Sequence, residues 1–441
     1  MPAISRRGFA KLAGASGVGA WAASAWAPFA IAQGSGKVVI VGGGAGGATV
    51  AHYVKRGAPA LDVTLIEVNP IYSSSFFSNL YIGGLRTLES LNHGYRGLRR
   101  LGVKVVHDFA TDVDAARRTV KTRDGRTYAY DRLVLSPGID IKYDSIPGYS
   151  REASRIMPHG YTTAALGKRQ IKQQLLAMRD GGTVVMVTPA DPYRCPPGPY
   201  ERACMIAHYL KTRKPRSKLV ILDPKKTFSK QAVFTEAFDK HYKDIIELHL
   251  TTEIDDFAVA SLDPKTREIV TKAGKKVKAD VANVIPQQRA GEIAVKAGCT
   301  EGDWCPIDPE SFSSRKVQNV YVLGDASIAA AMPKSAYSAN SQAKVVAADI
   351  LAELARKERF PPRFRNTCWS LLAPDDDVKV GGNYTPKDGK LEISGGFVSQ
   401  RDEAADVRRQ NYQESLGWYS AITADMFARA APAAPAAKKK S

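Results

Sequence analysis

Three features of this 441-residue chain predict an α/β fold with two Rossmann-like dinucleotide-binding domains and a small C-terminal α+β domain. A glycine-rich turn follows the first apolar strand, a Gly-Asp pair follows a late apolar strand, and another apolar strand begins near residue 183. Strands that alternate with helices in this way build parallel sheets. Hydrophobic residues make up 44% of the chain and charged residues 24%, which excludes extended disorder.

The two ends of the chain are predicted to lie outside the folded body. Residues 1–32 contain Ser5-Arg6-Arg7-Gly8-Phe9, a weakly apolar stretch and Ala30-Ile31-Ala32, a pattern typical of a twin-arginine export signal. The signal predicts a periplasmic protein, in which disulfides are allowed. Residues 429–441 are predicted to be a disordered Ala/Pro/Lys tail. After residue 32 no apolar run is long enough to predict a transmembrane segment.

The chain is strongly basic, with 63 Lys and Arg against 44 Asp and Glu and a formal net charge of +19. A surface of this kind attracts nucleic acid, anionic lipid or an acidic protein. The sequence has no zinc-finger, recognition-helix or aromatic-basic RNA motif, so nucleic acid is not an expected partner. No metal site is predicted.

The glycine-rich turn marks the start of the first domain. Strand Lys37–Val41 runs into Gly-Gly-Gly-Ala-Gly-Gly at residues 42–47, a helix is expected from about residue 48 to 55, and strand Asp62–Glu67 ends in an acid. This strand–turn–helix–strand–acid order is a dinucleotide-binding fingerprint.

Each position of the turn has a physical role in holding a dinucleotide. Gly42 permits the tight turn, Gly44 (with Ala45 beside it) lets the pyrophosphate approach the backbone, and Gly47 lets the helix pack closely on the strand. The helix N-terminus faces the phosphates. Glu67 is predicted to accept hydrogen bonds from ribose hydroxyls.

A late Gly-Asp pair favours FAD over NAD at this turn. Strand Asn319–Leu323 ends in Gly324-Asp325, and in flavoproteins with two dinucleotide-binding domains such a pair holds a ribityl hydroxyl of FAD. The helix expected over residues 335–354 directs its N-terminus toward the flavin pyrimidine. Leu133–Gly138, which includes Pro137 and Gly138, resembles the strand that closes the first half of the FAD domain in that superfamily.

The second nucleotide domain is expected to lack an NAD site. Its first strand, Thr183–Val187, is followed by a loop without the glycine fingerprint that contains Pro189, Pro192, Pro196 and Pro197. Proline has no backbone N–H to offer a pyrophosphate.

The predicted organisation therefore has six parts: a signal peptide at 1–32, the first part of the FAD domain at 33–150, the NAD-like domain at 151–285, the second part of the FAD domain at 286–358, a C-terminal domain at 359–428 and the tail at 429–441.

The sequence resembles the flavoprotein subunits of flavocytochrome c sulfide dehydrogenases, which are relatives of sulfide:quinone oxidoreductases. The resemblance covers essentially all of residues 37–425, and its most specific stretch is the Cys-Pro-Pro-Gly-Pro-Tyr-Glu run. The matching stretches are Val41–Gly47, Ser78-Asn79, Cys195-Pro-Pro-Gly-Pro-Tyr-Glu201-Arg-Ala, Ile285-Pro286 with Gln288-Arg-Ala-Gly291, Trp304-Cys305-Pro306, Gly324-Asp325-Ala326, Met332-Pro-Lys-Ser335 with Tyr337-Ser-Ala-Asn-Ser-Gln342, and Asn366-Thr-Cys368.

The resemblance implies a catalytic disulfide between Cys195 and Cys368 beside the flavin. Hydrosulfide is a soft nucleophile that can open such a bond. Glu201 is interpreted either as an acid/base at this centre or as an ordinary acid in the first turn of a helix. Trp418 corresponds either to an aromatic residue near the flavin or to a core tryptophan. The remaining cysteines, Cys204, Cys299 and Cys305, are interpreted as buried small residues or as a side pair.

The function expected from these features is oxidation of sulfide to sulfur or polysulfide by a periplasmic FAD enzyme that passes electrons to a c-type cytochrome. The chain has no Cys-x-x-Cys-His motif, so the haem must belong to another chain. The alternatives are a quinone-linked enzyme at the membrane surface and a flavin-loaded interaction protein without turnover.

One position departs from the family pattern. Its best-known members attach the flavin covalently through a cysteine three residues before the Ser-Asn pair, and Ser75 occupies that position here, ahead of Ser78 and Asn79. Residues 1–194 contain no cysteine. Since a serine hydroxyl is a much weaker nucleophile than a thiolate, FAD is predicted to bind without a covalent link.

Overall fold

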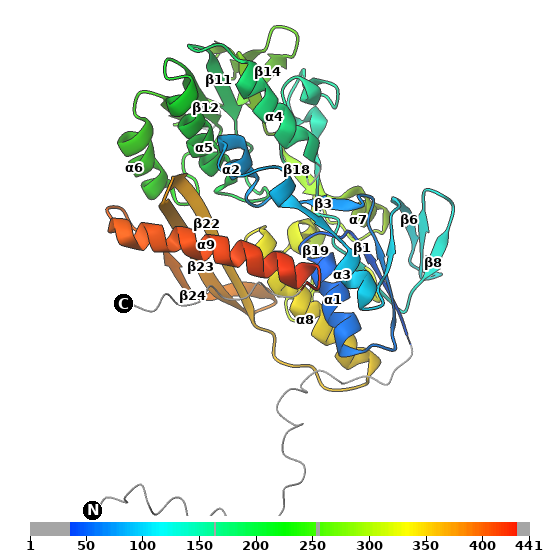
Figure 1. Ribbon diagram of the computed structural model, residues 1–441. Coiled ribbons are helices and arrows are strands. Elements are labelled where there is room, and N and C mark those ends of the chain that lie inside the picture. The colour runs from blue at the N-terminus through cyan, green and yellow to red at the C-terminus, as the bar shows by residue number, and fades with distance from the viewer. Residues whose placement is uncertain (1–35, 163–164, 253–255, 430–441) are drawn as a thin grey trace, which may run out of the picture.

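The first domain is built on a parallel five-stranded sheet with the strand order β20-β9-β1-β2-β5. It is seen in Figure 1, which shows the computed structural model; residues 36–162, 165–252 and 256–429 are described. The strands are β1 (Lys37–Val41), β2 (Asp62–Ile66), β5 (Lys104–Val106), β9 (Arg132–Leu135) and β20 (Val320–Val322), and the helices that pack on them are α1 (Gly47–Gly57), α3 (Arg96–Arg100) and α8 (Ala336–Leu354).

Two glycines set the approach of α1 to this sheet. Gly42 has φ +98°, a conformation that side-chain-bearing residues rarely adopt. A Cβ on Gly47 would lie 1.9 Å from the Gly42 carbonyl oxygen, so only glycine allows this close contact. Helix α1 begins at Gly47, one residue before the expected start, and the strand predicted at Lys37–Val41 is confirmed.

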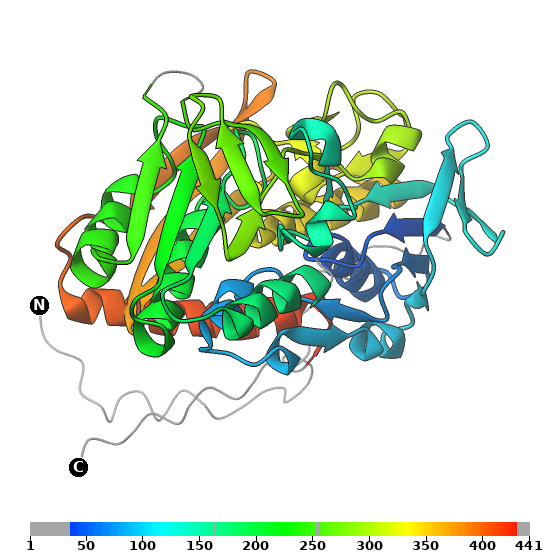
Figure 2. The same ribbon diagram turned by 90° about the horizontal axis from the view of Figure 1, so that it is seen from above.

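The second domain repeats the parallel arrangement in a four-stranded sheet with the order β13-β12-β11-β17. Figure 2, seen from above, shows this sheet beside an antiparallel meander. The strands of the sheet are β11 (Thr183–Val187), β12 (Lys218–Asp223), β13 (Ile246–Leu250) and β17 (Val281–Val284); its helices are α4 (Ala165–Ala177), α5 (Gly198–Arg213) and α6 (Gln231–Tyr242); the meander is β14 (Val259–Asp263), β15 (Glu268–Thr271) and β16 (Lys276–Lys278).

Short elements connect and border the two domains. Strands β10 (Ile139–Ile141) and β18 (Gln288–Ala290) pair antiparallel where the chain leaves the first domain and returns to it. The others are β3 (Ile71–Ser73), α2 (Ser78–Gly83), β4 (Asn92–Gly94), β6 (Ala110–Asp114), β7 (Thr119–Thr122), β8 (Thr127–Ala129), α7 (Glu292–Lys296), β19 (Cys305–Pro306) and β21 (Ser327–Ile328).

The C-terminal part joins the two domains. Its antiparallel sheet consists of β22 (Phe364–Ala373), β23 (Asp376–Lys387) and β24 (Lys390–Val398), and helix α9 (Ala405–Met426) lies across it in Figure 1. Strand β22 contacts α8 of the first domain and α5 of the second, so a side chain on β22 can reach a cavity between them. The predicted fold class, two Rossmann-like domains with a C-terminal α+β part, is confirmed.

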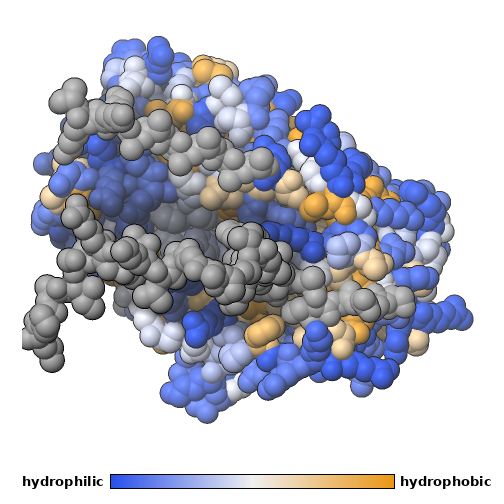
Figure 3. Space-filling view, turned by 60° about the horizontal axis from the view of Figure 1, so that its bottom comes forward, coloured by the Kyte–Doolittle hydropathy of each residue, from blue (hydrophilic) through white to orange (hydrophobic). Residues whose placement is uncertain are grey.

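The surface in Figure 3 is mainly hydrophilic, with hydrophobic residues in small separate patches. Within the described residues, no helix combines the length and the apolar character needed to cross a membrane. The predicted export signal at 1–32 and residues 430–441 of the predicted tail lie outside the described part of the chain.

Candidate active site

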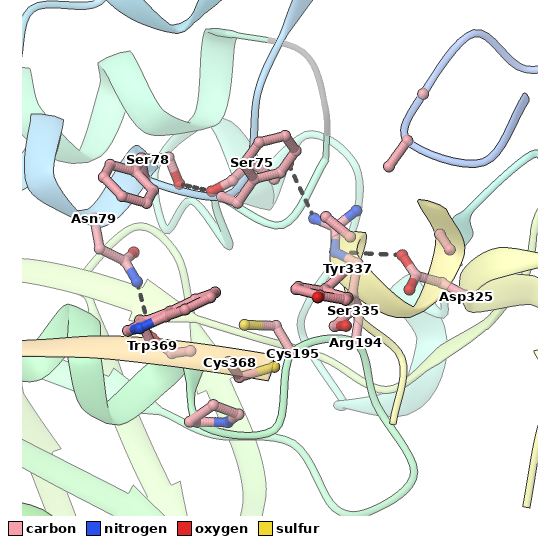
Figure 4. A pocket seen from close by; sticks show the side chains of 18 of the residues that line it. Ser75, Ser78, Asn79, Arg194, Cys195, Asp325, Ser335, Tyr337, Cys368 and Trp369 are labelled. Carbon is pink, nitrogen blue, oxygen red and sulfur yellow. Dashed lines mark hydrogen bonds and ion pairs between the residues drawn. The ribbon is translucent and has the colours of Figure 1, made fainter. Parts of the chain in front are cut away.

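A cavity lies where the three parts of the chain meet, and almost every residue predicted to be functional lines it. Figure 4 shows this cavity with the segments that contribute to it. Fourteen of the fifteen predicted site residues line it: Gly42, Gly44, Ala45, Glu67, Ser75, Asn79, Pro137, Gly138, Cys195, Glu201, Gly324, Asp325, Cys368 and Trp418. Gly47, the fifteenth, lies behind the cavity, in the contact between α1 and the turn.

One end of the cavity has the features that a dinucleotide needs. Glycines of the turn line it at the N-terminus of α1, where unpaired backbone N–H groups attract phosphate. The Glu67 carboxylate accepts hydrogen bonds from the backbone N–H groups of Gly43, at 2.7 Å, and Asn69, at 2.8 Å. These bonds hold the carboxylate at the cavity wall, as expected of a ribose-binding acid.

Asp325 provides the test of whether FAD fits. Its Oδ1 is buried and has no hydrogen-bond partner among the described residues, while Oδ2 lies 3.9 Å from Arg194 Nε. Burial raises the pKa of Asp325, although Arg194 and Lys334 oppose the rise. A buried acceptor without a donor is costly, and a ribityl hydroxyl is a donor of the right kind. The residues present therefore fit FAD.

Cys195 is presented by the loop between β11 and α5. Its backbone N–H donates to the Lys334 carbonyl at 2.8 Å, its own carbonyl accepts from Gly198 N at 2.8 Å, and its φ is +57°. The neighbouring N–H of Arg194 donates to Gln288 Oε1 at 2.9 Å. This loop is therefore attached to residues that follow the second domain in the chain. The backbone N–H groups of Arg194 and Cys195 are bonded within the protein and do not offer a site to a pyrophosphate.

Cys368 reaches the same cavity from β22. The Asn366 amide donates to the Cys368 Sγ at 3.5 Å, and Asn366 Oδ1 accepts from Ser335 Oγ at 2.6 Å. Figure 4 shows the sulfur atoms of Cys195 and Cys368 near each other, between Trp369 and Tyr337 in that view. The two thiols are free in the structure, so the disulfide implied by the family resemblance is not formed here and stays a prediction.

The helix position of Glu201 is confirmed, and its acid/base role stays a prediction. Glu201 lies in the first turn of α5 and also lines the cavity beside the cysteines. Asn79 Nδ2 donates to its Oε2 at 2.6 Å, and Leu371 N donates to its Oε1 at 3.1 Å. Burial raises the pKa of Glu201, and these two donors oppose the rise. A carboxyl group with a raised pKa keeps its proton to a higher pH than an exposed one, which suits a proton donor.

Aromatic side chains form one wall of the cavity. The Trp418 ring stacks on Tyr337 with centroids 6.1 Å apart and an interplanar angle of 6°, and it lies 5.3 Å from Trp369. Trp418 therefore belongs to the wall of the cavity. Cys204, Cys299 and Cys305 are fully buried free thiols within the hydrophobic cores, as the first of their two interpretations expects.

Several charged residues near the cavity were not predicted from the sequence, among them Arg202 of α5, which lines it. Arg194 precedes Cys195 and contacts Ser75 Oγ at 3.4 Å, and its position in the loop is the only signal that the sequence offers. Lys168, Lys230 and Asp377 are buried near the cavity, and nothing in the local pattern distinguishes them from surface charges. Burial raises the pKa of Asp377 to about 7.

Three protein-family models match this chain, and each describes a flavoprotein oxidoreductase or a part of one. The family model described as "Sulfide dehydrogenase [flavocytochrome c] flavoprotein chain, central" matches residues 168–286. "Flavocytochrome c sulphide dehydrogenase, flavin-binding" matches residues 360–427, and "Pyridine nucleotide-disulphide oxidoreductase" matches residues 36–178. The matches follow one another along most of the described chain.

Individual relatives agree with these matches. The chain is 44% identical over 46 residues to the sulfide dehydrogenase [flavocytochrome c] flavoprotein chain of Chlorobaculum thiosulfatiphilum, covering 96% of that sequence and 10% of this one. It is 23% identical over 367 residues to the sulfide-quinone reductase of Aquifex aeolicus, covering 77% of this chain and 81% of the relative. The chain is 21% identical to the mitochondrial sulfide:quinone oxidoreductase of Mus musculus, over 66% of this chain and 65% of the relative. This chain therefore spans slightly less than two thirds of the length of that relative.

Solved structures show the same fold. The sulfide:quinone oxidoreductase of Aquifex aeolicus superposes with a TM-score of 0.70 at 17% identity, over 89% of this chain and 93% of that one. The NAD-dependent persulfide reductase of A. fulgidus gives a TM-score of 0.61 at 16% identity, over 86% and 77% of the two chains.

Lys168 makes the stability of this region depend on pH. Its buried Nζ donates to the carbonyls of Ser73, at 2.9 Å, and Ser74, at 2.7 Å, and so supports the segment that leads to Ser75. Burial, assisted by Arg194 and Arg202, lowers its pKa from 10.5 to about 7. Between these pH values the unfolded chain binds more protons than the folded one, so the contribution of Lys168 to the free energy of unfolding rises with pH.

We therefore expect Lys168→Met to gain stability relative to the parent as the pH falls from about 10 to about 7. Urea unfolding of both proteins at several pH values measures the difference. Lys218→Met, which removes an exposed charge, is the control. A difference between Lys168→Met and the parent that does not change with pH would contradict the assignment.

Proposed function

Because the chain belongs to the flavocytochrome c sulfide dehydrogenase flavoprotein family, we propose that it oxidises sulfide to sulfur or polysulfide through a redox disulfide and FAD. One observation carries the proposal: Cys195 and Cys368, 173 residues apart, line one cavity together with the dinucleotide-binding residues. A cavity that only bound FAD would need neither cysteine.

The chemistry follows from the reactivity of sulfur. Hydrosulfide attacks a Cys195–Cys368 disulfide, forms a persulfide on one cysteine and releases the other as a thiolate. A second hydrosulfide removes the outer sulfur as hydrogen disulfide and leaves two thiolates. Bound FAD supplies the two-electron acceptor that allows the disulfide to re-form. Glu201, in contact with Asn79 at the cavity wall, is the acid/base that exchanges protons with the sulfur species.

The electron acceptor that we propose is a c-type cytochrome in the periplasm. The family name of the matched regions and the predicted twin-arginine signal both support it. Quinone is the second candidate, because the relatives in Mus musculus and Aquifex aeolicus are named for quinone. The net charge of +19 suits an acidic cytochrome surface in the first case and anionic lipid in the second.

The cysteine pair is tested by substitution. We expect Cys195→Ser and Cys368→Ser to retain FAD but to lose sulfide-dependent bleaching of the flavin by several orders of magnitude, because hydrosulfide then has no S–S bond to open. Stopped-flow absorbance measures the bleaching. Cys204→Ala, which alters a buried thiol outside the cavity lining, should bleach at the parental rate. Parental bleaching in either serine variant would exclude the disulfide route.

The acceptor is tested by kinetics. With sulfide as donor, we expect reduction of an acidic cytochrome c to be faster than reduction of a soluble quinone, and to slow as salt rises because screening weakens electrostatic steering. Stopped flow at low and high ionic strength measures both rates. A faster rate with quinone would favour the second candidate, and a salt-independent cytochrome rate would contradict electrostatic docking.

The attachment of FAD is tested by acid precipitation. Ser75 has a hydroxyl where the family's linking cysteine has a thiol, so we expect the yellow colour to remain in the supernatant. A Ser75→Cys variant is the matched comparison, since it restores the thiol. Colour in the parental pellet, or a flavin-bearing peptide in its mass spectrum, would show that non-covalent binding is wrong.

A further inference from the structure

Lys230 is a buried cation beside the cysteine pair. It immediately precedes α6, with φ +62°, and its residue is only 8% exposed. Its Nζ donates to Ser370 Oγ at 2.7 Å and to the Cys368 carbonyl at 3.2 Å. Both acceptors are uncharged, and among the residues that the structure describes no carboxylate forms an ion pair with Lys230. Burying an ammonium that forms no direct ion pair is costly, so its retention here requires an explanation.

The position of Lys230 relative to β22 indicates which sulfur it serves. Residues two apart on a strand point to the same face of the sheet, so the side chains of Cys368 and Ser370 share a face. Lys230 contacts the Ser370 hydroxyl on that face. Its ammonium is therefore on the side of β22 from which the Cys368 Sγ projects into the cavity.

Two carboxyl groups, those of Asp377 and Glu201, also lie near Lys230, and both accept hydrogen bonds from other donors. Asp377 interacts with the ammonium, but its Oδ1 accepts from Ser370 N at 2.9 Å, and the two oxygens of Glu201 accept from Asn79 and Leu371. Burial lowers the pKa of Lys230, while Cys368, Asp377, Glu201 and Cys195 oppose that change. When Cys368 carries a negative charge, its sulfur is the leading influence that opposes the lowering of the Lys230 pKa.

The two thiols have different surroundings. Burial raises the pKa of Cys195 to about 12, the nearby Cys368 and Glu201 add to the rise, and Arg194 and Lys230 oppose it only as the last and smallest influences. Burial also raises the pKa of Cys368, but there the Lys230 ammonium is the leading opposing influence, followed by hydrogen bonds from Asn366 and Ser335. A negative charge is thus better accommodated on Cys368 than on Cys195.

We propose that Lys230 sets the direction in which the disulfide opens, by stabilising the Cys368 sulfur as the leaving thiolate so that hydrosulfide adds to Cys195. The new bond joins the hydrosulfide sulfur to the Cys195 Sγ. The Cys195–Cys368 bond breaks, and its electron pair and negative charge remain on the Cys368 Sγ. The better-stabilised thiolate leaves faster, which directs the attack. Lys230 is a positioning residue, and this assignment rests on the proposed function.

The first test measures the thiols without sulfide. The FAD-loaded protein is reduced with a phosphine, treated with iodoacetamide between pH 6 and 10, and analysed by peptide mass spectrometry. In the parent, alkylation of Cys368 should rise at a lower pH than alkylation of Cys195. Lys230→Met should shift the Cys368 profile upward by at least about one pH unit, which corresponds to a tenfold slower reaction below its midpoint. Lys230→Arg should largely preserve the parental profile.

Two further variants keep this test decisive. Lys226→Met removes an exposed charge four residues away and should change neither profile. If Lys230→Met does not fold, Ser370→Ala, which removes the hydroxyl that anchors the ammonium, should shift the Cys368 profile in the same direction by a smaller amount. A folded Lys230→Met protein with the parental Cys368 profile would overturn the proposal.

The second test locates the persulfide. The oxidised protein is mixed with one equivalent of sulfide under anaerobic conditions and quenched with the alkylating reagent. The persulfide should be found on the Cys195 peptide, and a persulfide mainly on Cys368 would overturn the proposal. Absence of persulfide on both peptides would contradict the proposed function, whereas the alkylation profile decides the electrostatic role of Lys230 independently.

Discussion

The attachment of the Cys195 loop to the first domain is the constraint on which the cavity depends. The N–H of Cys195 is bonded to the Lys334 carbonyl, immediately before the cap of α8, and the N–H of Arg194 is bonded to Gln288. The Arg194 side chain then contacts both Asp325 and Ser75. These contacts fix the second domain against the first at the point where Cys195 must face the flavin-binding residues. Cys195 has φ +57°, a conformation that side-chain-bearing residues rarely adopt, and these contacts hold it there.

The C-terminal sheet completes the cavity by bringing Cys368 to the same place. Strand β22 contacts both α5 and α8, and the Asn366 side chain, two residues before Cys368, accepts hydrogen bonds from Ser335 and Ser338. The same Ser335 caps α8. The start of α8 therefore positions both cysteines. Ser335 and Ser338 hold the strand of Cys368 through Asn366, and Lys334, just before the helix, holds the loop of Cys195.

Desolvation gives this arrangement its chemistry. The junction of three parts of the chain encloses Glu201, Lys230 and Asp377 close to the sulfurs, and burial disfavours the charged form of each of them. In such surroundings a single ammonium has a larger effect on a thiolate than it would have in water. The same exclusion of water leaves one oxygen of Asp325 without a donor, which the hydroxylated chain of FAD can supply.

The amino-acid sequence was sufficient to predict the parts of this protein that depend on local geometry. The Gly42–Gly47 turn, the strands on either side of it and Gly324-Asp325 follow rules of backbone conformation and spacing that neighbouring residues carry, and the structure has them at the expected places. The predicted pairing of Cys195 with Cys368 came from the resemblance to a family, because spacing alone could not provide it. The charges that surround those sulfurs were found only in the folded structure. Lys230 and Asp377 are separated by 147 residues, and whether a lysine or an aspartate is solvated or buried beside a thiol depends on packing between elements far apart in the chain, which no local pattern encodes.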